Sequence, residues 1–241
     1  MVTATASPLA GAKGADRPRS GTGWNGSAWS AARLRQALRL YLVTDQASLK
    51  GRTLTDVVRA AVQGGVGCVQ LREKHASSRD FYAQARALMA LLTPLDIPLV
   101  INDRLDIALA CGAQGVHLGQ SDLPVQVARQ LLPPEVFIGW SVETAADVAL
   151  SASLPLDYLG VSPVFGTATK TDTATPWGLE GLARIRAATT LPLVAIGGIH
   201  TGNATPLMQA GADSLAVVSA ICSAADPLAA ALELRKLIDA H

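Results

Sequence analysis

The regular alternation of short β-rich runs with amphipathic stretches most constrains the fold of this chain. Segments such as TLTDVVRAAVQGG and RDFYAQARALMALL place apolar residues three and four positions apart, which is typical of helices packed on one face. Eight β-rich runs separate or flank these segments: 38–45, 68–74, 98–103, 115–120, 137–142, 158–165, 192–199 and 214–221. This pattern predicts an α/β fold, a closed parallel (β/α)8 TIM barrel. A doubly wound open sheet is the alternative, but it usually has fewer and less regular repeats.

The first part of the chain lacks this alternation. Its composition is rich in Gly, Ser, Thr and Ala, without periodicity, as in disordered tails. It also lacks the apolar core of a secretory signal, although an organelle transit peptide remains an alternative. We therefore predict a disordered N-terminal extension over residues 1–35 and a barrel domain over residues 36–241.

Charge and cysteine content exclude several classes of function. The chain has 20 Lys and Arg against 19 Asp and Glu, so its net charge is +1, which gives no basic footprint for nucleic acid or an anionic membrane. No apolar run is long enough to span a membrane. Three cysteines, Cys68, Cys111 and Cys222, lie far apart in apolar surroundings, which predicts buried free thiols in a reducing compartment. These features favour a cytoplasmic protein that acts on small molecules.

Cations and an amide follow the second β-rich run, where the active sites of such barrels lie. Strand alternation predicts that Gln70, Arg72 and Lys74 share one face, while Leu71 and Glu73 share the other. Two cations and an amide on one face suit a phosphorylated anion. The alternative is a solvated strand end at which Arg72 pairs only with Glu73.

Carboxylates follow the next two β-rich runs. Asn102 and Asp103 end the third run, and Asp122 comes shortly after the fourth. Oxygen ligands of this kind suit Mg²⁺, which takes one or two carboxylates together with water and substrate phosphate. The alternative for both aspartates is helix capping, which is compatible with metal binding.

A loop rich in hydroxyl groups follows the sixth run. Thr167, Thr169 and Lys170 supply two hydroxyls and one ammonium, but the Gly-Lys-[Ser/Thr] ending of a Walker loop is absent. An ordinary flexible turn is the alternative. At the mouth of a barrel that also carries cations and carboxylates, however, we expect this loop to bind an anion.

Glycines and a serine follow the last two runs, where such barrels usually bind phosphate. Gly197 and Gly198 end the seventh run, and Val218 and Ser219 end the eighth. Glycine allows backbone N–H groups to approach a ligand closely; the alternative is a tight turn from strand to helix. Two anion-binding regions and a metal suggest group transfer between phosphorylated substrates.

The histidines add little to this site. His117 falls within the fourth run, where it is either an inner-face contact or, as we expect, a satisfied core histidine. His75, His200 and His241 are expected to be peripheral. No triad of nucleophile, base and acid can be assembled from the sequence.

With these residues identified, the chain resembles the thiamine phosphate synthase family over about residues 38–240. The resemblance rests on five stretches in the order of the family: QLREK, INDRLDIALACGAQGVHLGQSDLP, VFGTATKTD, VAIGGI and VVSAI. The chain departs from the usual pattern at Glu143, Ser162 and Gly166.

The resemblance implies a transferase of thiamine biosynthesis. Its substrates would be hydroxymethylpyrimidine diphosphate and a (carboxy)thiazole phosphate, and its products thiamine phosphate and pyrophosphate. In the family the C–O bond breaks first, with the help of Mg²⁺ and cations, and no protein nucleophile is needed. The partners would be small molecules, with neither nucleic acid nor membrane, and a homo-oligomer is possible.

The resemblance also implies residue roles. Three cations would be catalytic: Arg72, Lys74 and Lys170. Pyrimidine diphosphate would contact Gln70, Leu71, Arg72, Glu73, Lys74, Asn102, Ser141 and Lys170. Thiazole phosphate would contact Thr167, Ala168, Thr169, Gly197, Gly198, Val218 and Ser219. Mg²⁺ would be held by Asp103 and Asp122.

Three other functions remain possible at this level. A thiazole tautomerase on the same barrel would dispense with the diphosphate-binding cations and carboxylates. A non-catalytic barrel would bind a phosphorylated vitamin precursor without releasing pyrophosphate. Another phosphate-binding barrel enzyme would require a general acid and base at the strand ends, which the sequence does not provide.

Overall fold

The structure, a computed structural model, describes residues 29–167 and 175–241. Within these residues, eight parallel strands form a closed barrel in sequence order, with β8 pairing back to β1. The strands are β1 (Leu40–Val43), β2 (Cys68–Leu71), β3 (Leu99–Asn102), β4 (Gly115–Leu118), β5 (Phe137–Val142), β6 (Tyr158–Val161), β7 (Leu193–Ile196) and β8 (Ser214–Val217). Each lies inside one of the predicted β-rich runs, so the (β/α)8 fold is confirmed.

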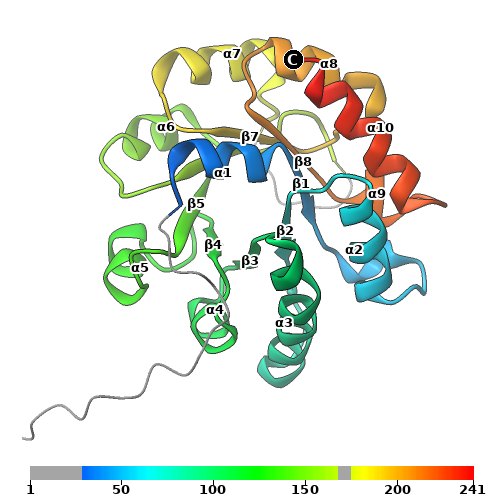
Figure 1. Cartoon of the computed structure of the whole chain (residues 1–241). Coiled ribbons are helices and arrows are strands. Elements are labelled where there is room, and N and C mark those ends of the chain that lie inside the picture. Colours follow the sequence, from blue (N-terminus) through cyan, green and yellow to red (C-terminus); the bar gives the residue numbers. More distant parts are fainter. Residues whose placement is uncertain (1–28, 168–174) are drawn as a thin grey trace, which may run out of the picture.

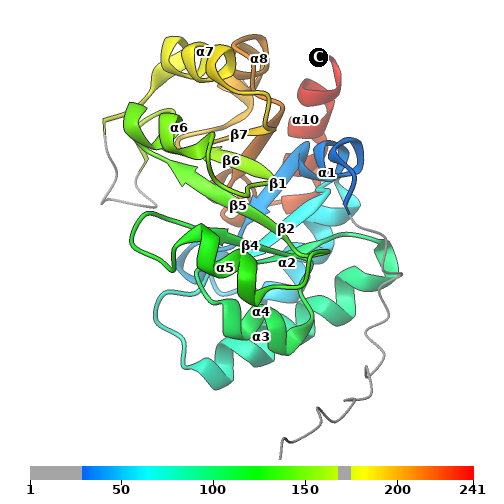
Figure 2. The same cartoon turned by 90° about the vertical axis from the view of Figure 1, so that its left-hand side faces the viewer.

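Helices surround the barrel on its outer side, except for α1 (Ala31–Leu38), which lies across one end (Figures 1 and 2). The α-helices are α1 (Ala31–Leu38), α2 (Leu54–Gln63), α3 (Ser78–Leu92), α4 (Leu105–Cys111), α5 (Val125–Leu131), α6 (Ala145–Ser151), α7 (Gly178–Ala188), α8 (Thr201–Gln209), α9 (Ser219–Cys222) and α10 (Pro227–Asp239). Two 3₁₀ turns, η1 (Gln46–Leu49) and η2 (Thr93–Leu95), complete the described elements. The connection of each strand to the next through a helix explains why all strand ends of one kind meet at one face.

Strand alternation divides the apolar residues into two cores. Residues such as Leu42 and Leu71 point outward and pack beneath the helices in the larger core, the outer core. Residues such as Tyr41, Val100 and Tyr158 point inward and form a smaller core within the barrel, the inner core. This division also sends Gln70 inward and Leu71 outward, as the alternation predicted.

Helix α1 closes the amino-terminal end of the barrel. Leu34 and Leu38 are buried in the inner core, and Trp29 packs edge-on against Phe137 with ring centroids 5.4 Å apart. Figure 1 shows α1 in dark blue beside β1 and β8. The boundary predicted at residue 35 therefore falls inside a helix, because residues 31–35 belong to α1; residues 1–28 lie outside the described part of the chain.

Two strand glycines make room for large rings inside the barrel. A Cβ atom at Gly139 would lie 2.0 Å from Cζ of Tyr158, and one at Gly160 would lie 2.9 Å from Cε1 of His117. No side chain larger than hydrogen fits at Gly139 without displacing the ring. These glycines therefore determine where Tyr158 and His117 stand below the mouth of the barrel.

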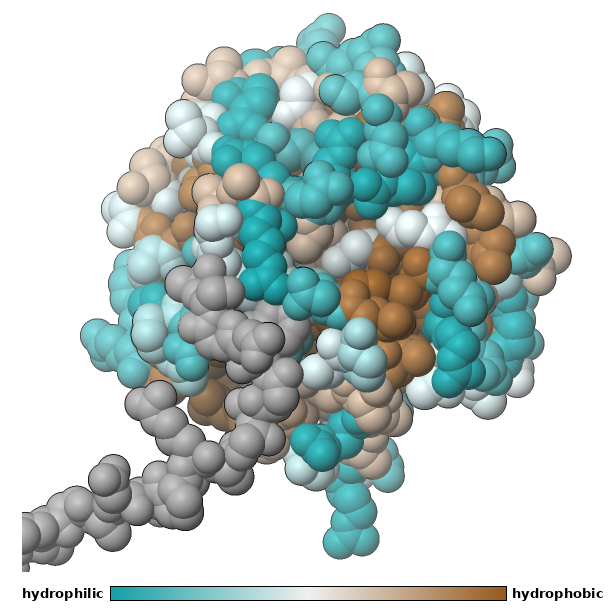
Figure 3. All heavy atoms as spheres, in the orientation of Figure 1, coloured by the Kyte–Doolittle hydropathy of each residue, from teal (hydrophilic) through white to brown (hydrophobic). Residues whose placement is uncertain are grey.

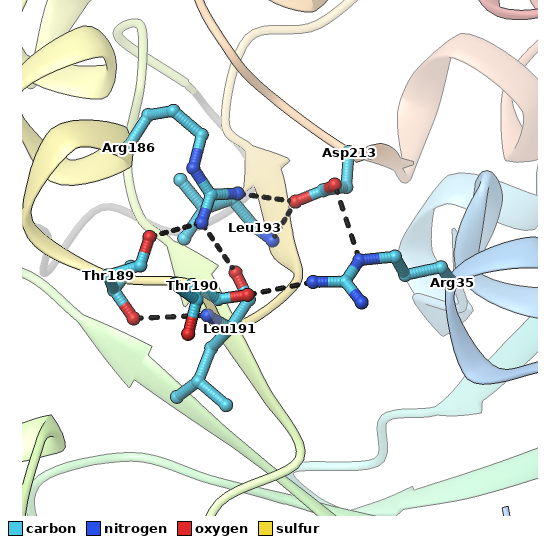
Figure 4. A network of polar contacts seen from close by, with 7 residues as sticks. All are labelled: Arg35, Arg186, Thr189, Thr190, Leu191, Leu193 and Asp213. Atoms are coloured by element: carbon cyan, nitrogen blue, oxygen red, sulfur yellow. Dashed lines mark hydrogen bonds and ion pairs between the residues drawn. The ribbon is translucent and has the colours of Figure 1, made fainter. Parts of the chain in front are cut away.

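An ion network joins α1, α7 and the starts of β7 and β8 at the amino-terminal end (Figure 4). Asp213 Oδ2 accepts hydrogen bonds from Arg186 Nη1 at 2.7 Å and from the Leu193 amide at 2.8 Å. Arg35 Nε lies 3.6 Å from Asp213 Oδ1, and Arg35 Nη2 donates to the Thr190 carbonyl at 2.7 Å. Both guanidinium groups thus have carboxylate and carbonyl partners within the protein.

The cysteines and the surface complete the description of the fold. Cys68, Cys111 and Cys222 are free and buried, as predicted. Among the described residues, no helix is long and apolar enough to cross a membrane. In Figure 3 the visible surface is mainly hydrophilic, and its main brown area lies between α2 and α3.

Candidate active site

A cavity of about 960 Å³ opens where the strands end in their following loops. It collects residues from positions far apart in the sequence, as expected at the carboxyl ends of barrel strands. The predicted site residues that line it are Gln70, Arg72, Lys74, Asn102, Asp103, Asp122, Ser141, Thr167, Gly197, Gly198, Val218 and Ser219. One cavity therefore contains both predicted anion-binding regions.

Among the described residues, two predicted site residues do not line this cavity. Leu71 is fully buried in the outer core, and Glu73 does not line the cavity, because strand alternation turns both away from Gln70 and Arg72. Their side chains therefore do not face the cavity, and their contact with substrate stays a prediction. Ala168, Thr169 and Lys170 lie outside the described residues.

Arg72 is held by residues that follow β1. Its Nη1 lies 3.7 Å from Asp45 Oδ1, and its amide donates to Thr44 Oγ1 at 3.1 Å. The acidic partner of Arg72 is therefore Asp45 rather than the Glu73 of the alternative interpretation. Asp45 also lines the cavity and accepts a hydrogen bond from the Ser48 amide at 3.1 Å. Asp45 is not among the residues predicted from the sequence, although its position just after the first strand was the available signal.

Lys74 contacts Asp103, one of the two predicted metal ligands. Its Nζ donates to Asp103 Oδ2 at 2.6 Å. Asp103 has φ 63°, a left-handed conformation that is uncommon outside glycine and often found at functional sites. Helix α4 has Arg104 at its N-cap without a side-chain capping bond, so Asp103 does not cap it. The strained Asp103 backbone directs its carboxylate to the cavity instead.

Asp122, the second predicted metal ligand, forms an acidic pair with Asp103. Its Oδ2 accepts a hydrogen bond from the Gly119 amide at 2.7 Å, and it does not cap α5. Burial raises the pKa of Asp122, the Gly119 amide opposes this, and the nearby Asp103 carboxylate raises the pKa further. Two carboxylates thus lie close enough to repel each other, with Lys74 as a nearby cation.

This acidic pair fits a hard divalent cation. Mg²⁺ prefers carboxylate oxygen and keeps water or phosphate in its remaining positions, and a cation between Asp103 and Asp122 would relieve their repulsion. Within residues 29–167 and 175–241, no group of three or more Asp, Glu, His or Cys forms a complete metal cage. Asp103 and Asp122 could therefore hold a metal only together with water or substrate oxygen.

A chain of hydrogen bonds crosses the floor of the cavity. Gln70 Nε2 donates to the Tyr41 hydroxyl at 2.9 Å, and the Tyr41 and Tyr158 hydroxyls are 3.0 Å apart. His117 Nδ1 lies 2.9 Å from the Tyr158 hydroxyl, and His117 Nε2 lies 2.9 Å from Ser141 Oγ. His117 is thus an inner-face contact that lines the cavity, as well as having hydrogen-bond partners. Sequence reasoning missed both tyrosines because their pairing depends on barrel closure.

The glycine-rich end of the site is shaped by the chain itself. Gly197 and Gly198 have φ 107° and 63°, and a Cβ atom at Gly198 would lie 2.6 Å from the Gly166 carbonyl oxygen. The loop after β6 packs on them, since Phe165 N donates to Gly197 O at 3.2 Å. Close packing therefore explains two successive glycines even without a ligand. His200, which we expected to be peripheral, lines the cavity and caps α8.

Comparisons with known proteins agree on one family. A family model described as thiamine monophosphate synthase matches residues 40–221. The thiamine-phosphate synthase of Albidiferax ferrireducens is 74% identical over 205 residues, which cover 85% of this chain and 94% of that protein. The thiamine-phosphate synthase of Vibrio parahaemolyticus is 51% identical over 84% of this chain and 99% of its own length. The solved thiamine phosphate pyrophosphorylase of Pyrococcus furiosus superposes with a TM-score of 0.79 at 38% identity, over 86% of this chain and 98% of that one.

Proposed function

The chain belongs to the thiamine monophosphate synthase family, and on this premise we infer that it is a transferase that makes thiamine phosphate. We propose that it joins hydroxymethylpyrimidine diphosphate to a (carboxy)thiazole phosphate and releases pyrophosphate; from the carboxylated form of the thiazole, CO2 leaves as well. We assign this reaction to the cavity because four charged residues lie close together at its mouth: Arg72, Lys74, Asp103 and Asp122. A monophosphate alone would not need so many charged groups, whereas a diphosphate with its metal would.

The protein's own part in the first step is to stabilise a departing diphosphate. Arg72 would supply a forked set of donors and Lys74 a point charge, while Lys170 would approach from the loop after β6. The C–O bond breaks and its electron pair leaves with pyrophosphate, so these cations stabilise negative charge as it develops. Arg72 is held beside Asp45, which keeps its guanidinium oriented before substrate arrives.

Asp103 and Asp122 would hold Mg²⁺, which supplies charge neutralisation at the diphosphate oxygens when bound. The two aspartates suit this role because their carboxylates repel each other unless a cation lies between them. Lys74 would then exchange its contact with Asp103 for one with the diphosphate.

The second substrate would lie across the cavity. Thr167, Thr169, Gly197, Gly198, Val218 and Ser219 would contact its phosphate through hydroxyl and backbone N–H groups. The thiazole nitrogen then donates its lone pair to the methylene carbon that pyrophosphate has left. The bond formed replaces the bond broken, so the reaction needs no nucleophile from the protein. The three free, buried thiols support our placement of this reaction in the cytoplasm.

The proposal is tested by measuring pyrophosphate and thiamine phosphate formed by the purified chain from both substrates. We expect product with Mg²⁺ and none with EDTA. Lys170→Ala should lose most of the rate, on the order of 10²-fold or more, if its ammonium stabilises the leaving group. Lys236→Ala is the matched control, because Lys236 lies on α10 away from the cavity.

Other results would redirect the assignment. Binding of either substrate without pyrophosphate release would indicate a non-catalytic barrel. Isomerisation of the thiazole phosphate alone would indicate a tautomerase. Turnover that is equal with Mg²⁺ and with EDTA would contradict the role proposed for Asp103 and Asp122.

A further inference from the structure

The hydrogen-bond chain beneath the cavity takes one direction when Gln70 is its first donor and each hydroxyl donates to the next member. At one end, Gln70 Nε2 can only donate, so the Tyr41 hydroxyl accepts from it. Tyr41 has one proton to give, and the Tyr158 hydroxyl lies 3.0 Å away. If Tyr41 donates there, the Tyr158 hydroxyl has its own proton left for His117 Nδ1, which lies 2.9 Å away. Each hydroxyl therefore accepts on the Gln70 side and donates on the His117 side.

This direction assigns a tautomer to His117. If Nδ1 accepts from Tyr158, the ring proton of neutral His117 is on Nε2, which donates to Ser141 Oγ at 2.9 Å. The Ser141 hydroxyl then has its own proton left to donate toward the cavity it lines. At the opposite end, Gln70 uses its amide nitrogen within the chain, and its Oε1 has no hydrogen-bond partner among the described residues. The chain thus offers a ligand one acceptor and one donor.

The packing keeps the chain in this arrangement. The rings of Tyr41 and Tyr158 are almost fully buried, and burial raises the pKa of both hydroxyls, so each keeps the proton that it must donate. His117 stacks on Tyr158 with ring centroids 5.6 Å apart, and Gly160 leaves the space that the imidazole fills. Rotation of the Gln70 amide would place a carbonyl against Tyr41 and would require every later proton in the chain to reverse.

We propose that Tyr41, Tyr158 and His117 are positioning residues that fix the Gln70 carbonyl and the Ser141 hydroxyl so that the cavity selects an aminopyrimidine over an oxopyrimidine. An exocyclic amine donates and therefore pairs with Gln70 Oε1, and a ring nitrogen accepts from Ser141. An oxo group in place of the amine would present a carbonyl to a carbonyl. This hydrogen-bond chain, which we call the relay, thereby determines which heterocycle reaches the cations that stabilise the departing pyrophosphate. The inference rests on the proposed function for the identity of the ring.

The first test determines which nitrogen of His117 carries the proton in the wild-type protein, and thus the direction of the relay. In ¹⁵N-histidine-labelled full-length chain, His117 Nδ1 should carry no proton and Nε2 should carry one; the signal is assigned by its loss in His117→Asn. Protonation at Nδ1 would overturn the proposal. This measurement needs neither turnover nor a correct choice of ring, so it stays informative if the synthase assay fails.

The second test measures selectivity by calorimetry. The probes are 4-amino-5-hydroxymethyl-2-methylpyrimidine phosphate and its 4-oxo analogue, with binding constants for the wild type, Tyr41→Phe and Tyr158→Phe. We expect the wild type to prefer the amino compound by roughly 10- to 100-fold, because the oxo compound leaves a polar group unpaired. In both variants this ratio should fall toward one, since the Gln70 amide is then free to turn.

A control variant and the melting temperature distinguish a loss of selectivity from a loss of folded protein. Tyr82→Phe removes a hydroxyl from an exposed tyrosine of α3 and should keep the wild-type ratio. A variant that melts at the wild-type temperature and keeps the wild-type ratio would overturn the relay. So would an equal loss of affinity for both probes, because that is the behaviour of a purely structural hydroxyl.

Discussion

The two ends of the barrel use the same kinds of charged residue in opposite ways. At the amino-terminal end, Asp213 accepts from Arg186 and from a backbone amide and also lies beside Arg35. At the carboxyl-terminal end, Asp122 has a raised pKa because it is partly buried and close to Asp103. One acidic group has its partners within the fold, and the other lies beside a second carboxylate. We interpret the difference to mean that the first end stabilises the barrel and that the second end binds a charged ligand.

The largest expected effect tests this contrast with two arginines. Arg72→Ala should lower kcat by about 10²- to 10³-fold, because a donor aimed at the leaving group is lost. Arg186→Ala should leave kcat unchanged per folded molecule but reduce the free energy of unfolding. Steady-state kinetics and urea denaturation of both variants are the measurements. Equal losses of kcat in the two variants would remove the distinction between the ends.

The next effect concerns stability alone. Asp213→Asn should lower the free energy of unfolding by about 2–3 kcal/mol, since two partly buried guanidinium groups lose their carboxylate partner. The pair formed by Arg235 and Asp239 provides the control, because Asp239 is half exposed. Asp239→Asn should therefore cost less than about 1 kcal/mol. Similar midpoints of urea denaturation for these two variants would contradict the account.

A smaller effect examines the strain at the ligand end. Gly198→Ala should lower the free energy of unfolding by about 1–2 kcal/mol, because its φ is 63° and a Cβ would press on the Gly166 carbonyl oxygen. A Cβ at Gly166 would meet no atom within 4 Å, so Gly166→Ala is the matched control. Thermal melting of the two variants should separate them clearly. If both melted at the wild-type temperature, close packing would not be the reason for glycine at position 198.

The smallest effect is a pH dependence. The raised pKa of Asp122 means that the folded chain holds this proton to a higher pH than the unfolded chain does. Unfolding releases the proton between the two pKa values, so this group's contribution to stability falls as pH rises through that window. In EDTA, Asp122→Asn should gain a few tenths of a kcal/mol over wild type as the pH rises above about 4, the ordinary pKa of an aspartate, and solvent screening limits this gain. Urea denaturation across this range would show a loss instead if the Asp122 carboxylate were stabilising.

The sequence predicted the parts of this molecule that depend on local pattern. Apolar periodicity placed all eight strands, and period-two alternation correctly separated Gln70 from Leu71. The same alternation turns the side chains of Leu71 and Glu73 away from the cavity, so their contact with substrate stays a prediction that rests on the resemblance.

Other features depend on closure of the barrel and could not be read locally. The contact between Tyr41 on β1 and Tyr158 on β6 crosses the interior and involves residues that look like ordinary core aromatics. Helix α1 is too short to be stable alone, and its order comes from burial of Leu34 and Leu38 in the inner core. Such pairings follow from the assembled fold rather than from any segment of it.

The most direct test compares one aspartate from each end in a single assay. The rate of Mg²⁺-dependent pyrophosphate release would be measured for Asp103→Asn and Asp213→Asn, each corrected for the fraction folded. We predict that Asp103→Asn loses nearly all of the rate and Asp213→Asn keeps that of the wild type. Retention of the rate by Asp103→Asn would contradict the assignment of the carboxyl-terminal cavity as the site where pyrophosphate leaves.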